Sequence, residues 1–271
     1  MGYGYSSLKN IAGNKKIFQN KKVLTLGVLF PYVEKNRHVN DLLINYDIDV
    51  TKSFKGFSEY LFCDVCGASK CDALDVSDYQ GAKLICNLND PIEQKYYEQY
   101  DVIIDAGTLE HLSNIPVAVN NIFSLLSVDG VYYFGNPCNG WVDHGFFQFS
   151  PTFYKDIVFK NSKLLILEKL FLLSGVSTMN VMNSDNIRLT SFVTSHNKAN
   201  ISGVIRKISN GKIEFDLMQA KYREWHNRDS NASIKKKNIL RVVFVKLFVG
   251  LCRSVLVPYK VKDVLLRLTG R

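Results

Sequence analysis

"YDVIIDAGTLEHL", residues 100–112, begins as an apolar strand pattern and ends in small and ionisable residues. Residues 102–104 form a continuous apolar run, which is typical of a strand that is buried on both faces of a parallel sheet. Asp105 follows the run directly, and Glu110 and His111 come shortly after it. The stretch therefore predicts a central strand whose carboxyl end carries polar groups.

Other segments repeat this pattern on both sides of the opening stretch. Before it, strands are predicted in residues 21–29, 70–81 and 82–91, and they end near Gly27, at Asp75 and at Asn87 respectively. After it, strands are predicted at 130–137 and, as a strand or a hairpin, at 163–175. Helices are predicted at 57–66, 116–126 and 150–161, the last with Ser150 as N-cap and Pro151 at the first helical position.

Strands that alternate with helices favour an α/β fold: a Rossmann-like, doubly wound, mostly parallel sheet covered on both faces. Right-handed crossovers then bring the carboxyl ends of the strands to one edge, where such sheets bind ligands. We therefore expect Asp75, Asn87 and Asp105 to gather along that edge. Near the end of the chain, Asn210-Gly211 between alternating segments predicts a hairpin within residues 201–217.

The charge is concentrated at one end of the chain. Residues 235–271 hold ten Lys/Arg and one acid, Asp263, so this segment accounts for the whole net charge of +9. A neutral body with a basic tail differs from a uniformly basic nucleic-acid binder, and no nucleic-acid partner is predicted. The chain has no signal-peptide pattern, and its six cysteines lie among apolar residues, as free thiols do in a reducing compartment. A cytoplasmic protein is expected.

Several motifs together resemble the class I S-adenosylmethionine-dependent methyltransferases. "YDVIIDAGTLEHL" is similar to the fourth strand and following loop of that superfamily, and "LSVDG" before "VYYFGNP" stands where the family has a helix–turn–strand segment. "HGFFQFSPTFY", "LDVSDYQGA" and "NLNDP" are similar to methyltransferases associated with bacterial surface-polysaccharide biosynthesis. The resemblance spans roughly residues 22–175.

The resemblance implies S-adenosylmethionine as cofactor and a set of residues that bind it. Asp75 would accept hydrogen bonds from the ribose hydroxyls, and Asn87 would lie near the adenine. Asp105, Ala106 and Gly107 would line the methionine portion of the cofactor. Gly27 would serve the first loop, although the family usually has two or three glycines there and this chain has one.

Two histidines are candidates for the catalytic base that an alcohol acceptor needs. His111 follows the fourth strand, and it either acts as a base or holds the loop through a structural hydrogen bond. His144, in "WVDHGFFQF", acts either as the base or as a residue that orients the substrate. No carboxylate–histidine cluster has a compelling metal spacing in the sequence, so no metal is indicated.

The basic tail permits three interpretations. The apolar run 239–257 is interrupted by Arg241, Lys246 and Arg253, which makes a spanning helix costly. A basic stripe beside an apolar face fits a peripheral helix on an anionic membrane. A helix packed on the body or on a second subunit is the main alternative, and nucleic-acid binding is the least favoured.

The sequence thus predicts four parts: a lead-in (1–21), a Rossmann-like methyltransferase domain (22–200), a hairpin and linker (201–234) and a basic amphipathic helical tail (235–271). The expected activity is O-methylation of a sugar or glycan, with the tail bringing the enzyme to the inner face of a membrane. A non-catalytic scaffold that docks through its tail is the alternative. A nicotinamide-dependent oxidoreductase is disfavoured because no G-x-G-x-x-G follows the first strand. The oligomeric state is left open.

Overall fold

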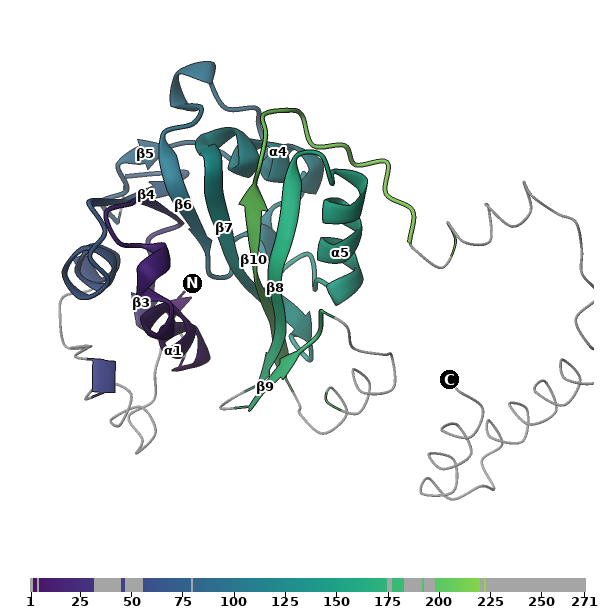
Figure 1. Cartoon of the computed structure of the whole chain (residues 1–271), viewed down its shortest axis with the longest axis horizontal. Helices are drawn as coiled ribbons and strands as arrows, with labels where there is room; N and C mark the ends of the chain where they lie inside the picture. The colour runs from purple at the N-terminus through teal and green to yellow at the C-terminus, as the bar shows by residue number, and fades with distance from the viewer. Residues whose placement is uncertain are drawn as a thin grey trace, which may run out of the picture. The chain divides into compact units, whose positions relative to one another are not determined.

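A computed structural model describes residues 2–3, 5–31, 45–46, 56–78, 80–174, 177–182, 192, 198–219 and 222 (Figure 1). The chain divides into two compact units, and the elements below lie in the first, which comprises residues 1–184 and 192–217. The predicted tail, residues 235–271, lies outside the described residues. Within the described residues, no helix is both long enough and apolar enough to cross a membrane.

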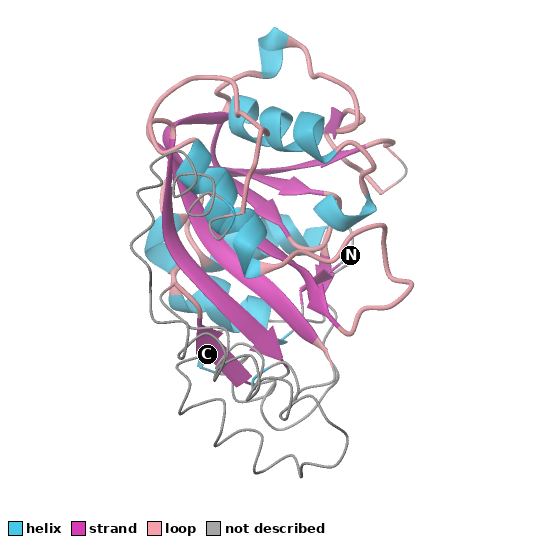
Figure 2. Cartoon of the chain, turned by 90° about the vertical axis from the view of Figure 1, so that its right-hand side faces the viewer, coloured by secondary structure: helices cyan, strands magenta, loops and turns pink. Residues whose placement is uncertain are grey.

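One eight-stranded mixed sheet forms the centre of the fold, and Figure 2 shows it as a continuous twisted layer with helices against it. The first five strands across the sheet are parallel, and the last three are each antiparallel to the preceding neighbour. The prediction of an α/β fold with a mostly parallel sheet is therefore confirmed for the first five strands. The last three strands form an antiparallel part. Across the sheet the strands are β5 (Leu84–Ile85), β4 (Lys70–Asp75), β2 (Lys22–Leu26), β6 (Tyr100–Asp105), β7 (Leu126–Asn139), β10 (Ala199–Lys207), β8 (Leu165–Ser174) and β9 (Ser177–Asn180).

The parallel strands follow the order of doubly wound nucleotide-binding sheets. Numbered along the chain within this sheet, β5-β4-β2-β6-β7 reads 3-2-1-4-5. The chain moves outward from β2 to β5 and then returns to β6 on the other side of β2. This reversal makes a switch point between the carboxyl ends of β2 and β6, the usual ligand position in such sheets. The parallel part of the sheet is thus doubly wound, and an antiparallel part is added at its far side.

The first face of the sheet is covered by the N-terminal residues and by the segment 57–65. Helix α1 (Tyr5–Gly13) and the short η1 (Lys15–Ile17) bury Leu8 and Phe18 against the sheet. Helix α3 (Phe57–Glu59) continues as the π-helical η3 (Tyr60–Val65) and packs on the same cluster. Residues 5–13 of the predicted lead-in thus form a helix whose Leu8 and Ile11 belong to the core. A small parallel pair, β1 (Gly2–Tyr3) with β3 (Phe30–Pro31), lies at this end of the chain.

The second face is covered by α4 (Ile115–Leu125) and α5 (Pro151–Lys160), both of which the sequence predicts. Phe123 of α4 makes an edge contact with Tyr132, and Tyr154 of α5 stacks on Phe134 with ring centroids 3.8 Å apart. Alternate residues of β7 point to opposite faces, so Tyr133 joins the first-face core while Tyr132 and Phe134 face α4 and α5. Two short 3-10 turns, η4 (Gln94–Tyr96) and η5 (Leu109–His111), flank β6.

The predicted hairpin at residues 201–217 does not form. Instead, β10 inserts between β7 and β8, and residues 208–217 contain no strand. This last stretch is held by two asparagine side chains: Asn120 exchanges hydrogen bonds with the backbone of Ile213, and Asn161 does so with the backbone of Glu214. These side-chain amides bond to the backbone in place of the partner strand that a hairpin at Asn210-Gly211 would provide. The sheet therefore extends past the domain boundary that the sequence predicts at residue 200.

The cysteines that the structure describes are all free thiols. Cys66 and Cys71 are buried, and burial raises the pKa of the Cys66 thiol to about 11. Cys63 and Cys86 are half-buried, as is Cys138, whose thiol pKa burial also raises to about 11. The expectation of apolar free thiols is confirmed for these five residues.

Candidate active site

The candidate site lies at the carboxyl edge of the sheet, beside the switch point. The Thr108 hydroxyl, in the loop after β6, donates a 2.6 Å hydrogen bond to the Leu26 carbonyl at the end of β2. The register pairs Leu26 with both Leu74 and Asp105, so the ends of the three strands are level. This alignment fixes the loops after β2, β4 and β6 side by side.

Three of the predicted cofactor residues lie in the β2–β4–β5 half of this edge. Gly27 adopts a left-handed φ of 82°, and its N–H donates to the Leu74 carbonyl at 2.7 Å. Asp75 is half-buried, and its Oδ1 accepts a 2.7 Å hydrogen bond from the N–H of Val76. Asn87 is exposed, and its amide bonds to Asn89 and Asp90. The side chains of Asp75 and Asn87 thus bond to near neighbours in the sequence, whereas Gly27 is buried and bonds to β4.

Asp105, at the end of β6, is buried and internally bonded. One carboxylate oxygen accepts a hydrogen bond from the Thr108 N–H at 2.8 Å, and the other accepts from the Tyr132 hydroxyl at 2.7 Å and the Asn136 amide at 2.9 Å. Burial raises the pKa of Asp105, and the hydrogen bonds oppose that rise. The carboxylate thus fixes the loop after β6, while Ala106 packs against the first-face core.

Gly107 lets this loop turn tightly over Glu110. Its φ is +94°, and a Cβ at this position would lie 3.0 Å from Glu110 Oε1. A side chain here would be strained by the backbone conformation and crowded by the carboxylate. The backbone conformation and the buried Glu110 carboxylate therefore both require a glycine at this position.

Glu110 is the central residue of the site, and the sequence reasoning assigns it no role. It is fully buried, and its Oε2 accepts a 3.2 Å hydrogen bond from Asn136. Among the described residues, its Oε1 is one of the few buried side-chain atoms with no hydrogen-bond partner. Burial, and then the charge of Asp105, raise the pKa of Glu110 to about 8. A buried carboxyl with a free oxygen is a functional-site signal.

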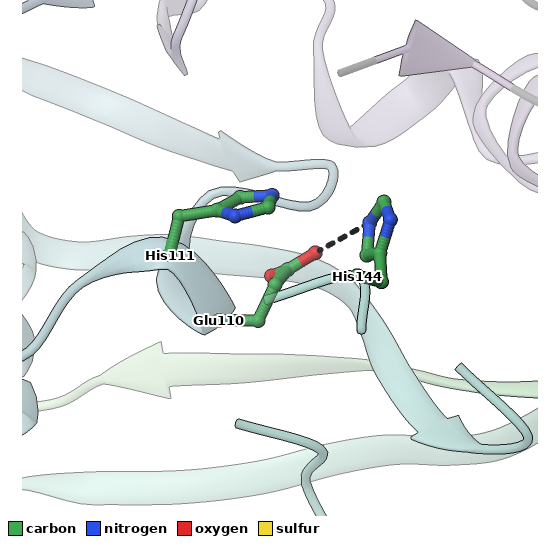
Figure 3. A group of neighbouring side chains, drawn as sticks. All are labelled: Glu110, His111 and His144. Carbon is green, nitrogen blue, oxygen red and sulfur yellow. Dashed lines mark ion pairs between the residues drawn. The ribbon is translucent and has the colours of Figure 1, made fainter. Parts of the chain in front are cut away.

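The two predicted histidines converge on this free oxygen, as Figure 3 shows. His144 Nε2 lies 3.7 Å from Glu110 Oε1, which is too long for a hydrogen bond but close enough for an ion pair. The rings of His111 and His144 have centroids 5.2 Å apart, and both residues are exposed to solvent. Burial and the nearby His144 lower the pKa of His111. One potential ligand atom from each of the three residues lies within 4.8 Å of the others.

The loop that carries His144 is fixed by the backbone of Glu110. The Glu110 carbonyl accepts hydrogen bonds from the N–H groups of Phe146 and Phe147 at 2.8 and 3.2 Å. Gly145 permits this approach, because a Cβ there would lie 2.9 Å from the same carbonyl. Glu110 therefore holds both the turn after β6 and the loop after β7, which explains how distant positions in the sequence meet.

An aromatic wall borders the cluster. Phe146 and Phe147 are 71% and 40% exposed, whereas Phe149 is buried in the core. A pocket of about 530 Å³ lies along this loop and the start of α4, with Phe147, Phe153 and Phe215 in its lining. Trp141 lies beside His144 with ring centroids 5.0 Å apart. Phe149 thus belongs to the core, whereas Phe146 and Phe147 face solvent beside the histidines.

The sequence also does not predict the role of two hydrogen-bonded residues, Asn136 and Tyr132, that lie behind Glu110 and the histidines. Asn136 donates to both buried carboxylates and accepts a hydrogen bond from the Tyr154 hydroxyl of α5. Tyr132 completes the contacts of Asp105. The only local signal is an asparagine inside an otherwise apolar strand, since its partners come from three other elements. Together these residues hold Glu110 and Asp105 in fixed positions behind the two histidines.

No family model matches the chain, and no curated protein matches it. Solved structures do match it. A S-adenosylmethionine-dependent methyltransferase from Mesorhizobium loti is 9% identical, with 73% of this chain and 99% of that chain covered and a TM-score of 0.44. A geranyl diphosphate methyltransferase in complex with SAM is 10% identical, with 75% and 85% covered and a TM-score of 0.48. A branched-chain polyamine synthase from Thermus thermophilus is 13% identical, with 78% and 59% covered and a TM-score of 0.40.

Proposed function

We propose that the chain is a S-adenosylmethionine-dependent O-methyltransferase that acts on a hydroxyl of a sugar or glycan. The observation that carries the proposal is the alignment of Gly27, Asp75 and residues 105–107 at the switch point of a 3-2-1-4-5 sheet. A group with catalytic chemistry, Glu110 with His111 and His144, stands directly beside that edge. The polysaccharide assignment rests on the motif resemblance.

The cofactor part of the proposal uses residues with matching chemistry. The Asp75 carboxylate suits the two ribose hydroxyls, since its hydrogen bond to Val76 uses one lone pair only. Gly27 and Ala106 leave room for the backbone to approach the cofactor. Asn87 has amide groups near solvent for the adenine. Asp105 would contribute through the loop that it holds, because its carboxylate oxygens already accept three hydrogen bonds.

The chemistry is an in-line displacement. The acceptor oxygen forms a bond to the methyl carbon, the carbon–sulfur bond breaks with its electron pair going to sulfur, and the hydroxyl proton leaves. Alignment of the reactants can supply about 7–11 kcal/mol of the barrier reduction. We assign the handling of the hydroxyl proton to His144 and His111, backed by Glu110. The exposed faces of Phe146 and Phe147 offer a surface on which a sugar ring can stack.

The first experiment is a calorimetric titration of the full-length protein with S-adenosylhomocysteine, the product form of the cofactor. We expect binding in the micromolar range or tighter. The Asp75→Ala variant should lose roughly 1.5–3 kcal/mol of binding free energy, since hydrogen bonds to a charged group disappear. Glu168→Gln, which changes a carboxylate of β8 that pairs with Arg206 outside the proposed contacts, serves as the control and should bind as the wild type does.

A well-folded protein that does not bind S-adenosylhomocysteine would refute the enzyme proposal and favour the non-catalytic scaffold. Wild-type binding that Asp75→Ala leaves unchanged would place the ribose elsewhere. Methyl transfer itself is then measured with labelled S-adenosylmethionine and a panel of glycan acceptors. Transfer to an amine or a thiol alone would contradict the O-methyltransferase assignment.

We also propose that residues 235–271 bring the protein to an anionic membrane surface. The segment carries the whole net charge of the chain beside apolar residues. Full-length protein should sediment with vesicles that contain an anionic lipid and not with purely zwitterionic ones. A chain ending at residue 234 should remain in the supernatant, and its continued binding to the anionic vesicles would refute this part of the proposal.

A further inference from the structure

We propose that Glu110, His111 and His144 bind one divalent transition-metal ion. The inference rests on the proposed function for what the ion would do, and on the geometry alone for where it binds. The three side chains come from η5 and from the loop after β7, and the fold brings them together at the carboxyl edge of the sheet (Figure 3). None of the comparisons above assigns an ion to this chain.

The spacing of the donor atoms fits a single ion. Zinc and similar ions bind imidazole nitrogen and carboxylate oxygen at about 2.0–2.2 Å, so the donors around one ion lie about 3–4 Å apart. Glu110 Oε1 and His144 Nε2 are 3.7 Å apart, inside this range. All three donor atoms lie within 4.8 Å of one another. Small rotations of the two exposed imidazoles close the remaining distance.

The state of Glu110 is an independent sign of a missing ligand. Its side chain is 1% exposed, yet Oε1 has no hydrogen-bond partner among the described residues. A buried carboxylate oxygen left in this way is costly unless something binds it. The other oxygen is held by Asn136, which fixes the carboxylate so that Oε1 points toward the imidazoles. This is the arrangement that orients ligands around metal ions.

The donor set selects the class of ion. Two imidazoles with one carboxylate favour ions such as Zn²⁺, Fe²⁺, Co²⁺ or Mn²⁺ over Mg²⁺ and Ca²⁺, which prefer oxygen ligands. Three protein ligands leave coordination positions open, as in catalytic sites. The exposure of both histidines makes those positions reachable by an acceptor hydroxyl. With an ion bound, the two histidines would serve as its ligands in place of acting as the base. The ion would lower the pKa of an acceptor hydroxyl, whose proton would then pass to solvent before methyl transfer.

The test uses the full-length protein without a histidine tag, treated with EDTA and dialysed. Calorimetric titration with Co²⁺ and with Mn²⁺ should give one site per chain, and Mg²⁺ should bind at least ten times more weakly. Glu110→Gln and His144→Gln should each weaken Co²⁺ binding more than tenfold. His144 is half-exposed, so His144→Gln remains informative if the buried Glu110→Gln variant fails to fold.

Two control variants separate this site from other donors. Glu93→Gln alters an exposed carboxylate that pairs with Lys95, and it should bind Co²⁺ as the wild type does. Cys63→Ser removes a half-buried thiol, and it should also leave Co²⁺ binding intact. The visible spectrum of the Co²⁺ complex should lack the sulfur-to-cobalt charge-transfer band that thiolate ligands produce.

Three results would overturn the inference. They are a folded wild-type protein that binds no ion, one-site binding that survives His144→Gln, and binding that Cys63→Ser abolishes. Equal affinity for Mg²⁺ would overturn the assignment to a transition metal. Parallel titration with S-adenosylhomocysteine keeps the two proposals apart. Ion binding without S-adenosylhomocysteine binding would refute the proposed function alone, and the reverse would refute the metal site alone.

Discussion

At the ends of β4 and β5, polar side chains bond to their own sequence neighbours, whereas at the ends of β6 and β7 they bond to one another across the sheet. Asn87 shows the first case: it is exposed and contacts Asn89 and Asp90. Asn136 shows the second: it is buried and contacts Asp105, Glu110 and Tyr154. The side chains at the ends of β4 and β5 can change their contacts when a ligand binds. Those at the ends of β6 and β7 hold one another in fixed positions.

Under the proposed function, this difference corresponds to two roles within one edge, cofactor binding and catalysis. A cofactor with many hydroxyl and amine groups can be held by exposed side chains that exchange water for ligand. Groups that meet a reacting atom gain from fixed positions, since no reorganisation is then needed at the moment of reaction. Substitutions in the β4–β5 half should therefore change binding, and substitutions in the β6–β7 half should change stability as well.

The largest effect is expected for Asn136→Ala, compared with Asn87→Ala. Loss of Asn136 leaves two buried carboxylates and the Tyr154 hydroxyl short of a partner, so the free energy of unfolding should fall by about 3–5 kcal/mol. Asn87→Ala removes exposed turn contacts and should cost about 1 kcal/mol or less. Urea unfolding of both variants measures the difference. Equal losses would show that the two halves do not differ in the way described.

Two left-handed glycines give a second and smaller contrast. Gly81 has a φ of +86° with nothing within 4 Å of a built Cβ, whereas Gly107 has a φ of +94° with Glu110 Oε1 at 3.0 Å. Gly81→Ala should cost about 1–2 kcal/mol from backbone strain alone. Gly107→Ala should cost about 1 kcal/mol more, because the added methyl group crowds the carboxylate. The difference in stability between the two variants, measured by thermal unfolding, isolates the effect of the crowding. A larger loss of stability for Gly81→Ala than for Gly107→Ala would contradict this prediction.

The smallest contrast concerns a single hydroxyl group. Tyr132→Phe removes one of the three hydrogen bonds to the buried Asp105, and the free energy of unfolding should fall by about 1–2 kcal/mol. Tyr97→Phe, at an exposed position before β6, should stay within about 0.5 kcal/mol of the wild type. Chemical unfolding measures both. No loss for Tyr132→Phe would mean that Asp105 replaces this partner with solvent.

Much of the parallel half could be predicted because its signals are local. The apolar runs of β2, β4 and β6 and the cap and proline at the start of α5 lie within a few residues of each other. Helix α1 was missed because a nine-residue helix owes its stability to packing, here of Leu8 and Ile11 on a core formed by later strands.

The residues of the candidate site could be identified only in part from the sequence, for the same reason. The histidines and the strand-end residues stand out by type and position, so the sequence identifies them. The role of Glu110 depends on Asn136 from β7, on Gly145 from the next loop and on its own burial, and none of these is a local property. The spacing between His111 and His144 gave no metal signal because the crossover through α4 and β7 decides their distance.

The place of β10 has a consequence for how the protein is made. This strand is the last of the sheet to leave the ribosome, yet it lies between β7 and β8, which precede it. Until residue 207 has emerged, β7 has an open edge and β8 has no neighbour on that side, so β7 exposes unpaired N–H and C=O groups that other chains could pair with. The candidate site, built on β6 and β7, thus belongs to a sheet whose inner strand β10 is added after the strands on both sides of it.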